Sequence, residues 1–212
     1  MKIVGRGILI SFAVWLGSCG GDGVKPVAPT VLPSSTPAPP RILNFQAMSG
    51  GYSSGTSAKF LRNGTSFYTG SRGFSVVGIN MATGETVKPA TTFDTWATRS
   101  FSGDSHQRVI DTLSDFPNGT LILIAVSDEA GLTLDDLGCL PSTPPGSLCC
   151  RPLGKPWADD LIRSLESLGA DQIRNYCYRN SWAMIAVKGQ GSKGEGLRVL
   201  SSFAVGYEFT LP

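Results

Sequence analysis

Two neighbouring carboxylates, Asp128 and Glu129, stand where an apolar run, residues 121–126, comes to its end. Paired carboxylates are the groups that glycoside hydrolases use, and Asp94 is a conceivable partner for either of them. The only histidine in the sequence, His106, could act as a general base, but no Gly-x-Ser-x-Gly elbow accompanies it. We expect His106 to be solvated, because it is near the start of an amphipathic segment. A hydrolase is therefore a minor alternative, and Glu129 is expected only to solvate the turn.

Four cysteines lie in the second half of the chain: Cys139, Cys149, Cys150 and Cys177. In an exported protein, an even number of thiols predicts two disulfides, for which three pairings exist. Because adjacent cysteines rarely bridge each other, pairings that join Cys149 or Cys150 to Cys177 are favoured. The spacing lacks the close ligand pairs of a zinc site, and no histidine is nearby. We therefore expect neither a metal nor another cofactor.

The N-terminal residues have the pattern of a bacterial lipoprotein signal. A basic start is followed by an apolar stretch, residues 8–16, that is too short to span a bilayer as a permanent helix. Residues 16–19 read LGSC, which resembles a lipobox, in which the cysteine is acylated. We expect residues 1–18 to be a signal peptide and Cys19 to carry a lipid anchor, with a plain secretory signal as the alternative. The protein would then be exported and held on the periplasmic or cell-surface face of a bacterial membrane.

Residues 19–40 are rich in proline, glycine, serine and threonine and carry almost no charge. Such a segment cannot bury enough surface to fold, so we expect an extended tether before a single domain at 41–212. The chain has 18 basic and 16 acidic residues. Loss of Lys2 and Arg6 with the signal makes the two numbers equal, so no basic surface predicts a nucleic-acid partner.

The domain is predicted to alternate short strands with two amphipathic helices. Apolar residues repeat at helical spacing in both helices, and glycine, asparagine and proline mark the turns. The proline- and cysteine-rich stretch 138–155 is predicted to be a cross-linked loop insertion. The expected strands are 42–48, 58–67, 72–80, 85–93, 120–127, 183–187 and 197–211, the helices 104–116 and 156–168, the turns 49–51 and 63–64, and a loop 189–196.

Eight short motifs occur in a set order along the domain. They are Arg72-Gly73, Thr83-Gly84-Glu85, Phe93-Asp94-Thr95-Trp96, PNGT at 117–120, VSDEA at 126–130, LESLG at 165–169, YRNSWA at 178–183 and VKG at 187–189. Each is weak alone, but the ordered set resembles the domain of the interleukin-like EMT inducer and PANDER family. The same domain forms the stem of protein O-mannose N-acetylglucosaminyltransferase and occurs in hyaluronan-handling cell-surface proteins.

The resemblance implies an α+β domain, a compact β-β-α sandwich of two mainly antiparallel sheets with flanking helices. It also implies no catalytic activity, since family members act as secreted signalling factors or as carbohydrate-binding modules. Two features depart from the family. The insertion at 138–155 follows the DEA segment, where relatives run directly into a helix, and the cysteines of the vertebrate factors occupy other positions. The vertebrate signalling role is therefore not carried over.

The resemblance further implies a sugar site. Sugar-binding members contact their ligand through an Arg, an Asp and a second Arg in motifs that match Arg72, Asp128 and Arg179. A carboxylate accepts from sugar hydroxyls, a guanidinium donates in a planar fork, and Trp182 or Tyr178 could stack on a pyranose. The structural alternatives are that Asp128 and Arg179 pair with each other and that Trp182 lies in the core.

The sequence thus predicts a non-enzymatic, membrane-tethered lipoprotein whose single domain binds a glycan or another cell-surface ligand. The alternative is a protein-interaction module of the cell envelope without sugar specificity, using a sheet edge or the insertion at 138–155. An envelope glycoside hydrolase is the third hypothesis.

Overall fold

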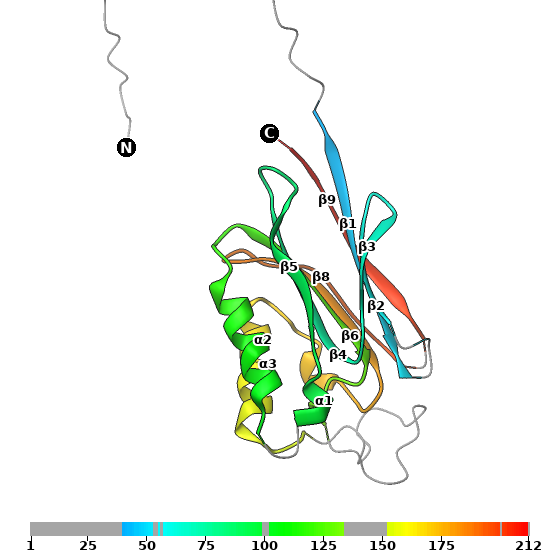
Figure 1. Cartoon of the computed structure of the whole chain (residues 1–212), viewed down its shortest axis with the longest axis vertical. Coiled ribbons are helices and arrows are strands. Elements are labelled where there is room, and N and C mark those ends of the chain that lie inside the picture. The colour runs from blue at the N-terminus through cyan, green and yellow to red at the C-terminus, as the bar shows by residue number, and fades with distance from the viewer. Residues whose placement is uncertain are drawn as a thin grey trace, which may run out of the picture. The chain divides into compact units, whose positions relative to one another are not determined.

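The computed structural model describes most of the domain and none of the N-terminal segment (Figure 1). The predicted signal peptide at 1–18, the lipidated Cys19 and nearly all of the tether are outside the described residues. The same holds for Cys139, Cys149 and Cys150 and for most of the insertion. The described residues are 40–52, 55, 57–98, 102–133, 152–199 and 201–211.

Strand β6, Thr120–Asp128, is buried along nearly all of its length, and its two faces set the layers of the fold. Ile122 and Ile124 pack in a core with the two long helices, whereas Leu121 and Leu123 pack with a second layer of strands. Successive side chains of a strand point to opposite faces, so a strand with an unbroken apolar run such as 121–126 must be covered on both sides. The apolar run in the sequence is therefore the central strand.

The nine strands of the described residues join in one mixed, mostly antiparallel sheet with the order β3-β2-β1-β6-β4-β5. In addition, β7 pairs with β6 and β8, and β9 pairs with β1. Phe45 and Phe60 from β1 and β2 share a core with Leu123 and Ile185, so the sheet folds back on itself into two layers. The α+β class is confirmed, but one connected sheet replaces the two separate sheets expected. The other strands are β1 Ile42–Gly51, β2 Ala58–Arg62, β3 Thr65–Gly70, β4 Gly73–Asn80, β5 Thr86–Phe93, β7 Ser181–Val187, β8 Gly191–Arg198 and β9 Phe203–Thr210.

Helices α2 and α3 cover one face of the layer that contains β4, β6 and β7 (Figure 1). Leu161 and Leu165 of α3 are four residues apart, which places them on one side of the helix, toward the core. None of the helices in the described ranges is long and apolar enough to cross a membrane. The helices are α1 Thr95–Thr98, α2 Asp104–Asp115, α3 Pro156–Ser167 and the 3-10 helix η3 Ile173–Asn175.

Strand β8 replaces the loop predicted over 189–196. Its glycines and polar residues have low β propensity, so the local sequence favours a loop. Pairing with β7 nevertheless makes the segment a strand, and its glycines leave room for β9. A Cβ on Gly196 would overlap the ring of Phe203. The prediction was wrong because tertiary pairing outweighed the local preference.

The end of β1 fills a gap between β6 and β7. The pairing of β6 with β7 stops at Ala125, and the last two residues of β1 pair with β6 beyond that point. Ser49 ties the three strands together. Its Oγ donates to the carbonyl of Val126 (2.6 Å) and accepts a hydrogen bond from the main-chain N–H of Trp182 (2.9 Å).

The turn predicted at 49–51 is therefore a strand end. Gly51 is required there for space, since a Cβ would overlap the carbonyl oxygen of Arg179. The main-chain N–H of Gly51 donates to the hydroxyl of Ser181 (2.7 Å), at the start of β7. A glycine pair that normally indicates a turn here permits a close approach of two backbones.

We predict that Gly73→Ala destabilises the domain more than Gly119→Ala. Both glycines have a positive φ, 103° and 83°, so alanine strains the backbone at each position. A Cβ on Gly73 would also overlap the carbonyl oxygen of Phe93, whereas nothing lies within 4 Å of a Cβ on Gly119. We expect the overlap to add about 1–3 kcal/mol to the loss of unfolding free energy, measured by urea denaturation. Equal losses would contradict the close approach of β4 to the end of β5.

Candidate ligand-binding end of the sheet

The three residues that the resemblance indicated, Arg72, Asp128 and Arg179, lie at one end of the sheet. Arg72 immediately precedes β4, Asp128 ends β6, and Arg179 comes shortly before β7. Neighbouring antiparallel strands run in opposite directions, so the starts of β4 and β7 lie beside the end of β6. Helix α1 lies at the same end (Figure 1). We define the polar edge as Tyr52, Arg72, Asp94, Asp128 and Arg179.

Arg72 is oriented by Asp94, the residue that follows β5. Its Nε donates to Oδ1 (3.0 Å) and its Nη2 to Oδ2 (2.6 Å), which makes a two-point ion pair. The hydrogen bond to Asp94 raises the pKa of Arg72, and the charge of Asp128 adds to this effect. Asp94 also accepts from the main-chain N–H of Ala97, as expected of a capping residue. Because both side chains are partly exposed, the pair orients Arg72 more than it stabilises the fold.

The guanidinium of Arg179 lies against two tyrosine rings. Its Cζ is 3.6 Å from the ring centroid of Tyr52 and 4.7 Å from that of Tyr178. Tyr178 in turn contacts Trp96, with 5.5 Å between the ring centroids. Each cation–π contact of this kind contributes about 0.5–2 kcal/mol and leaves the in-plane N–H donors of the guanidinium accessible. The rings therefore hold the side chain without using its hydrogen bonds.

Asp128 and Arg179 share an unusual backbone conformation. Their φ angles are 61° and 64°, in the left-handed region that residues with a side chain rarely adopt. Across the ranges described, Asn63 in the β2–β3 turn is the one other non-glycine residue with a positive φ. Such strain persists where surrounding contacts impose it, and it concentrates at functional sites.

The structural pairing of Asp128 with Arg179 does not form among the described residues. No hydrogen bond or ion pair in that part of the chain involves the carboxylate of Asp128 or the guanidinium of Arg179. Arg179 stacks on tyrosines, and Asp128 is partly exposed at the end of β6. Both charged groups therefore keep their hydrogen-bonding capacity for solvent or a ligand.

Glu129, directly after Asp128, connects the two strained residues. Its Oε2 accepts a hydrogen bond from the main-chain N–H of Arg179 (2.5 Å), and its Oε1 accepts one from the N–H of Gly131 (3.0 Å). The residue is 2% exposed. The expectation that Glu129 only solvates the turn was therefore wrong. A buried carboxyl group fixes the main chain that carries Arg179.

The loop after β6 is also held by side chains from other elements. The hydroxyl of Tyr176 accepts from the N–H of Ala130 (3.1 Å), and Thr95 Oγ1 donates to the carbonyl of Ala130 (2.6 Å). His106 Nε2 lies 3.0 Å from the carbonyl oxygen of Gly131. These bonds satisfy main-chain groups that the ending strand leaves without ladder partners.

His106 is a buried structural residue rather than the solvated one that the sequence predicted. It is 0% exposed, and burial lowers the pKa of its imidazole. The neutral ring, with its proton on Nε2, donates to the carbonyl of Gly131. Its Nδ1 has no hydrogen-bond partner among the described residues. A histidine enclosed in this way cannot reach a substrate from outside, so it is not a general base.

Trp182 lies in the core, and its proposed stacking on a ligand is excluded by burial. The residue is 0% exposed and packs edge-on against Phe74, with 6.1 Å between the ring centroids. Its indole N–H donates to Glu195 (2.7 Å). The core alternative is therefore correct for this residue, because β7 is buried on both faces.

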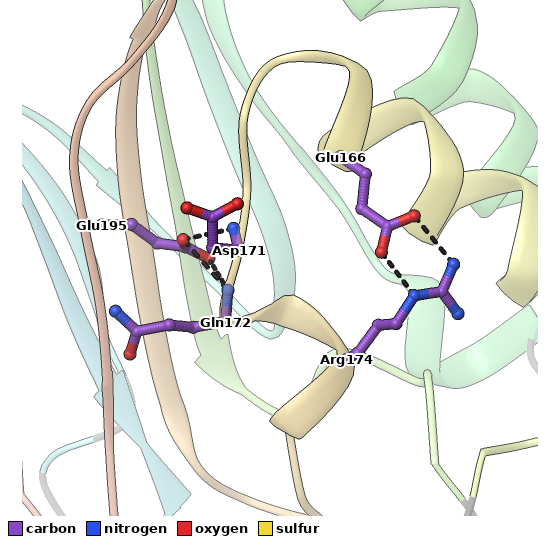
Figure 2. A network of polar contacts seen from close by, with 5 residues as sticks. All are labelled: Glu166, Asp171, Gln172, Arg174 and Glu195. Atoms are coloured by element: carbon purple, nitrogen blue, oxygen red, sulfur yellow. Dashed lines mark hydrogen bonds and ion pairs between the residues drawn. The ribbon is translucent and has the colours of Figure 1, made fainter.

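Glu195 also holds the segment that leads to Arg179 (Figure 2). Its carboxylate accepts hydrogen bonds from the main-chain N–H groups of Asp171 (2.7 Å) and Gln172 (3.0 Å). Close by, Arg174 forms a two-point ion pair with Glu166 on α3. Each charged group in Figure 2 except Asp171 is bonded within the protein, so this network supports the fold.

Cys177 is buried two residues before Arg179. Its favoured partners, Cys149 and Cys150, are outside the described residues, so the pairing stays a prediction. A cross-link at this position would join the insertion to the segment that carries Arg179.

A surface depression of about 300 Å³ lies at the opposite end of the sheet, near Asn80 and Thr120. Its lining includes no charged side chain and no member of the polar edge. In the described part of the chain, no three His, Cys, Asp or Glu side chains gather so as to hold a metal ion. The polar edge is the candidate site because of its chemistry and its strained backbone.

A sequence profile of the interleukin-like EMT inducer family matches residues 72–138 and 148–190, which is more than half of the chain. The chain belongs to the interleukin-like EMT inducer family. Arg72, Asp128 and Arg179 all fall within the matched ranges. A search of curated proteins found no match.

Membership of the interleukin-like EMT inducer family confirms the resemblance. The break between the matched ranges falls inside the insertion at 138–155, which is where the sequence departs from the family. Sequence reasoning missed two members of the local structure, Tyr52 and Glu129. Tyr52 precedes the matched ranges, and no local pattern links it to Arg179. The one sequence signal for the burial of Glu129 is the apolar run at 121–126, which ends shortly before it.

We predict that the stability of this family member falls as the pH rises from about 5 to about 8 through Glu129. Burial raises the pKa of this carboxyl group from its ordinary value of 4.5 to about 8. Between these values the folded state keeps a proton that the unfolded state has lost, so ionisation favours unfolding. The contribution is on the order of a few kcal/mol, fully present below the ordinary pKa and lost as the pH approaches about 8.

The measurement is the unfolding free energy of the wild type minus that of Glu129→Gln, taken at several pH values. The amide does not titrate, and the opposite contribution of His106, whose pKa is lowered by burial, is common to both proteins and cancels. We expect the difference to decline with rising pH. A difference that stays constant across this range would show that Glu129 is already ionised in the folded protein at low pH.

Proposed function

We propose that this domain is a non-enzymatic binding module that recognises carbohydrate at the polar edge. One observation carries the proposal. Asp128 and Arg179 have strained backbones, and their charged groups have no bonded partner among the described residues. Strain of about 1–3 kcal/mol per residue is retained where function uses it. The matching positions of sugar-binding family members support the same residues.

The chemistry of the polar edge suits a sugar. Asp128 can accept hydrogen bonds from two adjacent hydroxyl groups, and the planar guanidinium of Arg179 can donate several. Tyr52 is 50% exposed and adds aromatic surface beside Arg179. Arg72, oriented by Asp94, contributes a further donor at the margin. A pyranose ring presents both hydroxyl groups and apolar C–H surface, which is what these side chains can contact.

Hydrolysis is the weaker proposal. A glycoside hydrolase needs two carboxyl groups that reach the scissile bond. Glu129 is buried and bonded to the main chain, and Asp94 is engaged by Arg72. Of the three carboxyl groups that the sequence offered, Asp128 alone remains exposed without an ion pair among the described residues. One carboxylate supports recognition but not acid–base catalysis of this kind.

We predict that Asp128→Asn and Arg179→Gln each weaken glycan binding, to an affinity that is still measurable, while the domain still melts cooperatively. Each change removes charge-assisted hydrogen bonds worth about 1.5–3 kcal/mol, which weakens binding roughly 10- to 150-fold. Binding is measured first on a glycan array and then by titration calorimetry with the best oligosaccharide. Arg163→Gln is the matched control, because Arg163 is an exposed cation on α3 that pairs with Asp160.

Two results would contradict the carbohydrate proposal. The first is that the wild type binds no glycan on the array. The second is that Asp128→Asn and Arg179→Gln bind as well as the wild type. In either case the protein-interaction alternative is tested by excising residues 138–155 and measuring capture of an envelope partner. Lost capture would assign the contact to the insertion.

We also propose that the domain is carried on a bacterial membrane by a lipid on Cys19. The LGSC sequence at 16–19 and the proline-rich tether support this placement. Cys19→Ser should move the protein from the membrane to the soluble fraction and abolish labelling by a tagged fatty acid, because each buried methylene contributes about 0.8 kcal/mol. Ser34→Ala, in the tether, is the control. Retained labelling in Cys19→Ser would disprove the anchor.

A further inference from the structure

The two arginines of the polar edge differ in how their charge is used. Arg72 donates to both carboxylate oxygens of Asp94, so its charge is balanced within the protein. The guanidinium of Arg179 makes no hydrogen bond or ion pair with any described residue. Its contacts are the rings of Tyr52 and Tyr178. Within the described ranges, therefore, no bonded carboxylate neutralises the positive charge of Arg179.

Arg179 is also prepared for a partner that binds at two points. The Cζ of Arg179 lies over the rings of Tyr52 and Tyr178, and these contacts use none of the N–H donors, which lie in the plane of the guanidinium. The main chain of Arg179 is fixed by its hydrogen bond to Glu129, so little freedom is lost when a ligand binds. A carboxylate, sulfate or phosphate accepts two parallel N–H bonds from such a fork, and these bonds are roughly twice as strong as neutral ones.

None of the acidic groups described around Arg179 forms an ion pair with its guanidinium. Asp94 is paired with Arg72. Burial raises the pKa of Glu129 to about 8, so this group is mostly uncharged at neutral pH. Asp128 keeps its carboxylate at the edge, where it complements hydroxyl groups. The polar edge thus combines the carboxylate of Asp128, which can accept hydrogen bonds from hydroxyl groups, with the guanidinium of Arg179, which can donate hydrogen bonds to an anion.

We infer that Arg179 binds an oxyanion on the sugar and that the preferred ligands of the polar edge are acidic glycans. The inference rests on the carbohydrate site proposed above and adds the class of ligand. Uronic and sialic acids carry a carboxylate and hydroxyl groups on one ring, which matches Arg179 beside Asp128. Sulfated sugars offer the same oxyanion chemistry in a different group.

The test compares uronic- and sialic-acid oligosaccharides with their methyl esters, which keep the shape of the ligand and lose its charge. We expect the wild-type chain to bind the acids at least about tenfold more tightly than the esters. In Arg179→Gln the ratio of the two affinities should fall to about one. Raising the salt concentration should weaken binding of the acids and leave binding of the esters unchanged.

Further variants separate charge from geometry. Arg179→Lys keeps the charge and loses the planar fork, so its preference for acids should be smaller and more sensitive to salt. Arg163→Gln removes one exposed cation elsewhere and should keep the wild-type ratio. A melting curve of each variant shows whether the domain is folded.

The outcomes distinguish this inference from the carbohydrate proposal. Equal affinity of the wild type for acid and ester would overturn the inference and leave the carbohydrate site standing. A preference that survives in Arg179→Gln would also overturn it, since the anion would then be bound elsewhere. No binding to any glycan, acidic or esterified, would overturn both. A stronger preference for sulfated than for carboxylated sugars would support the inference and name sulfate as the oxyanion.

Discussion

The hydrogen bond between the carboxyl group of Glu129 and the main-chain N–H of Arg179 connects two segments that are 50 residues apart in the sequence. It joins the end of β6 to the approach to β7. A buried carboxyl group is costly unless its oxygens have donors, and this one also accepts from Gly131. Removing the carboxyl group of Glu129 would leave the main-chain N–H groups of Arg179 and Gly131 without this partner. The main-chain conformation of Arg179, and so the place of its guanidinium in the polar edge, depends on this contact.

The polar edge also depends on how the strands separate. Where β6 and β7 separate, the end of β1 lies between them. The hydroxyl of Ser49 on β1 forms one hydrogen bond to β6 and one to β7. Tyr52 follows directly and reaches the guanidinium of Arg179. A residue larger than glycine at position 51 would overlap the backbone of that segment. The same departure from regular pairing therefore shapes the polar edge and supplies one of its side chains.

The three positions that the resemblance indicated do not have equal surroundings in this chain. Arg72 is held by Asp94, whereas Asp128 and Arg179 keep their charged groups unpaired among the described residues. A shared motif states which residue types are present. It does not state which of them are already neutralised inside the protein. That difference separates Arg72, whose charge is paired inside the protein, from the two residues whose charged groups can still take a bonded partner.

The sequence by itself determined the elements whose pattern is local. The apolar run of β6, the amphipathic helices and the family motifs could all be recognised, because periodicity and turn chemistry operate over a few residues. The tertiary structure alone decided the burial of His106 and Glu129, the strand character of β8 and the stacking of Tyr52 on Arg179. Each of these depends on which distant segments meet. Burial, desolvation and backbone pairing are set by contacts across the fold, and no local spacing encodes them.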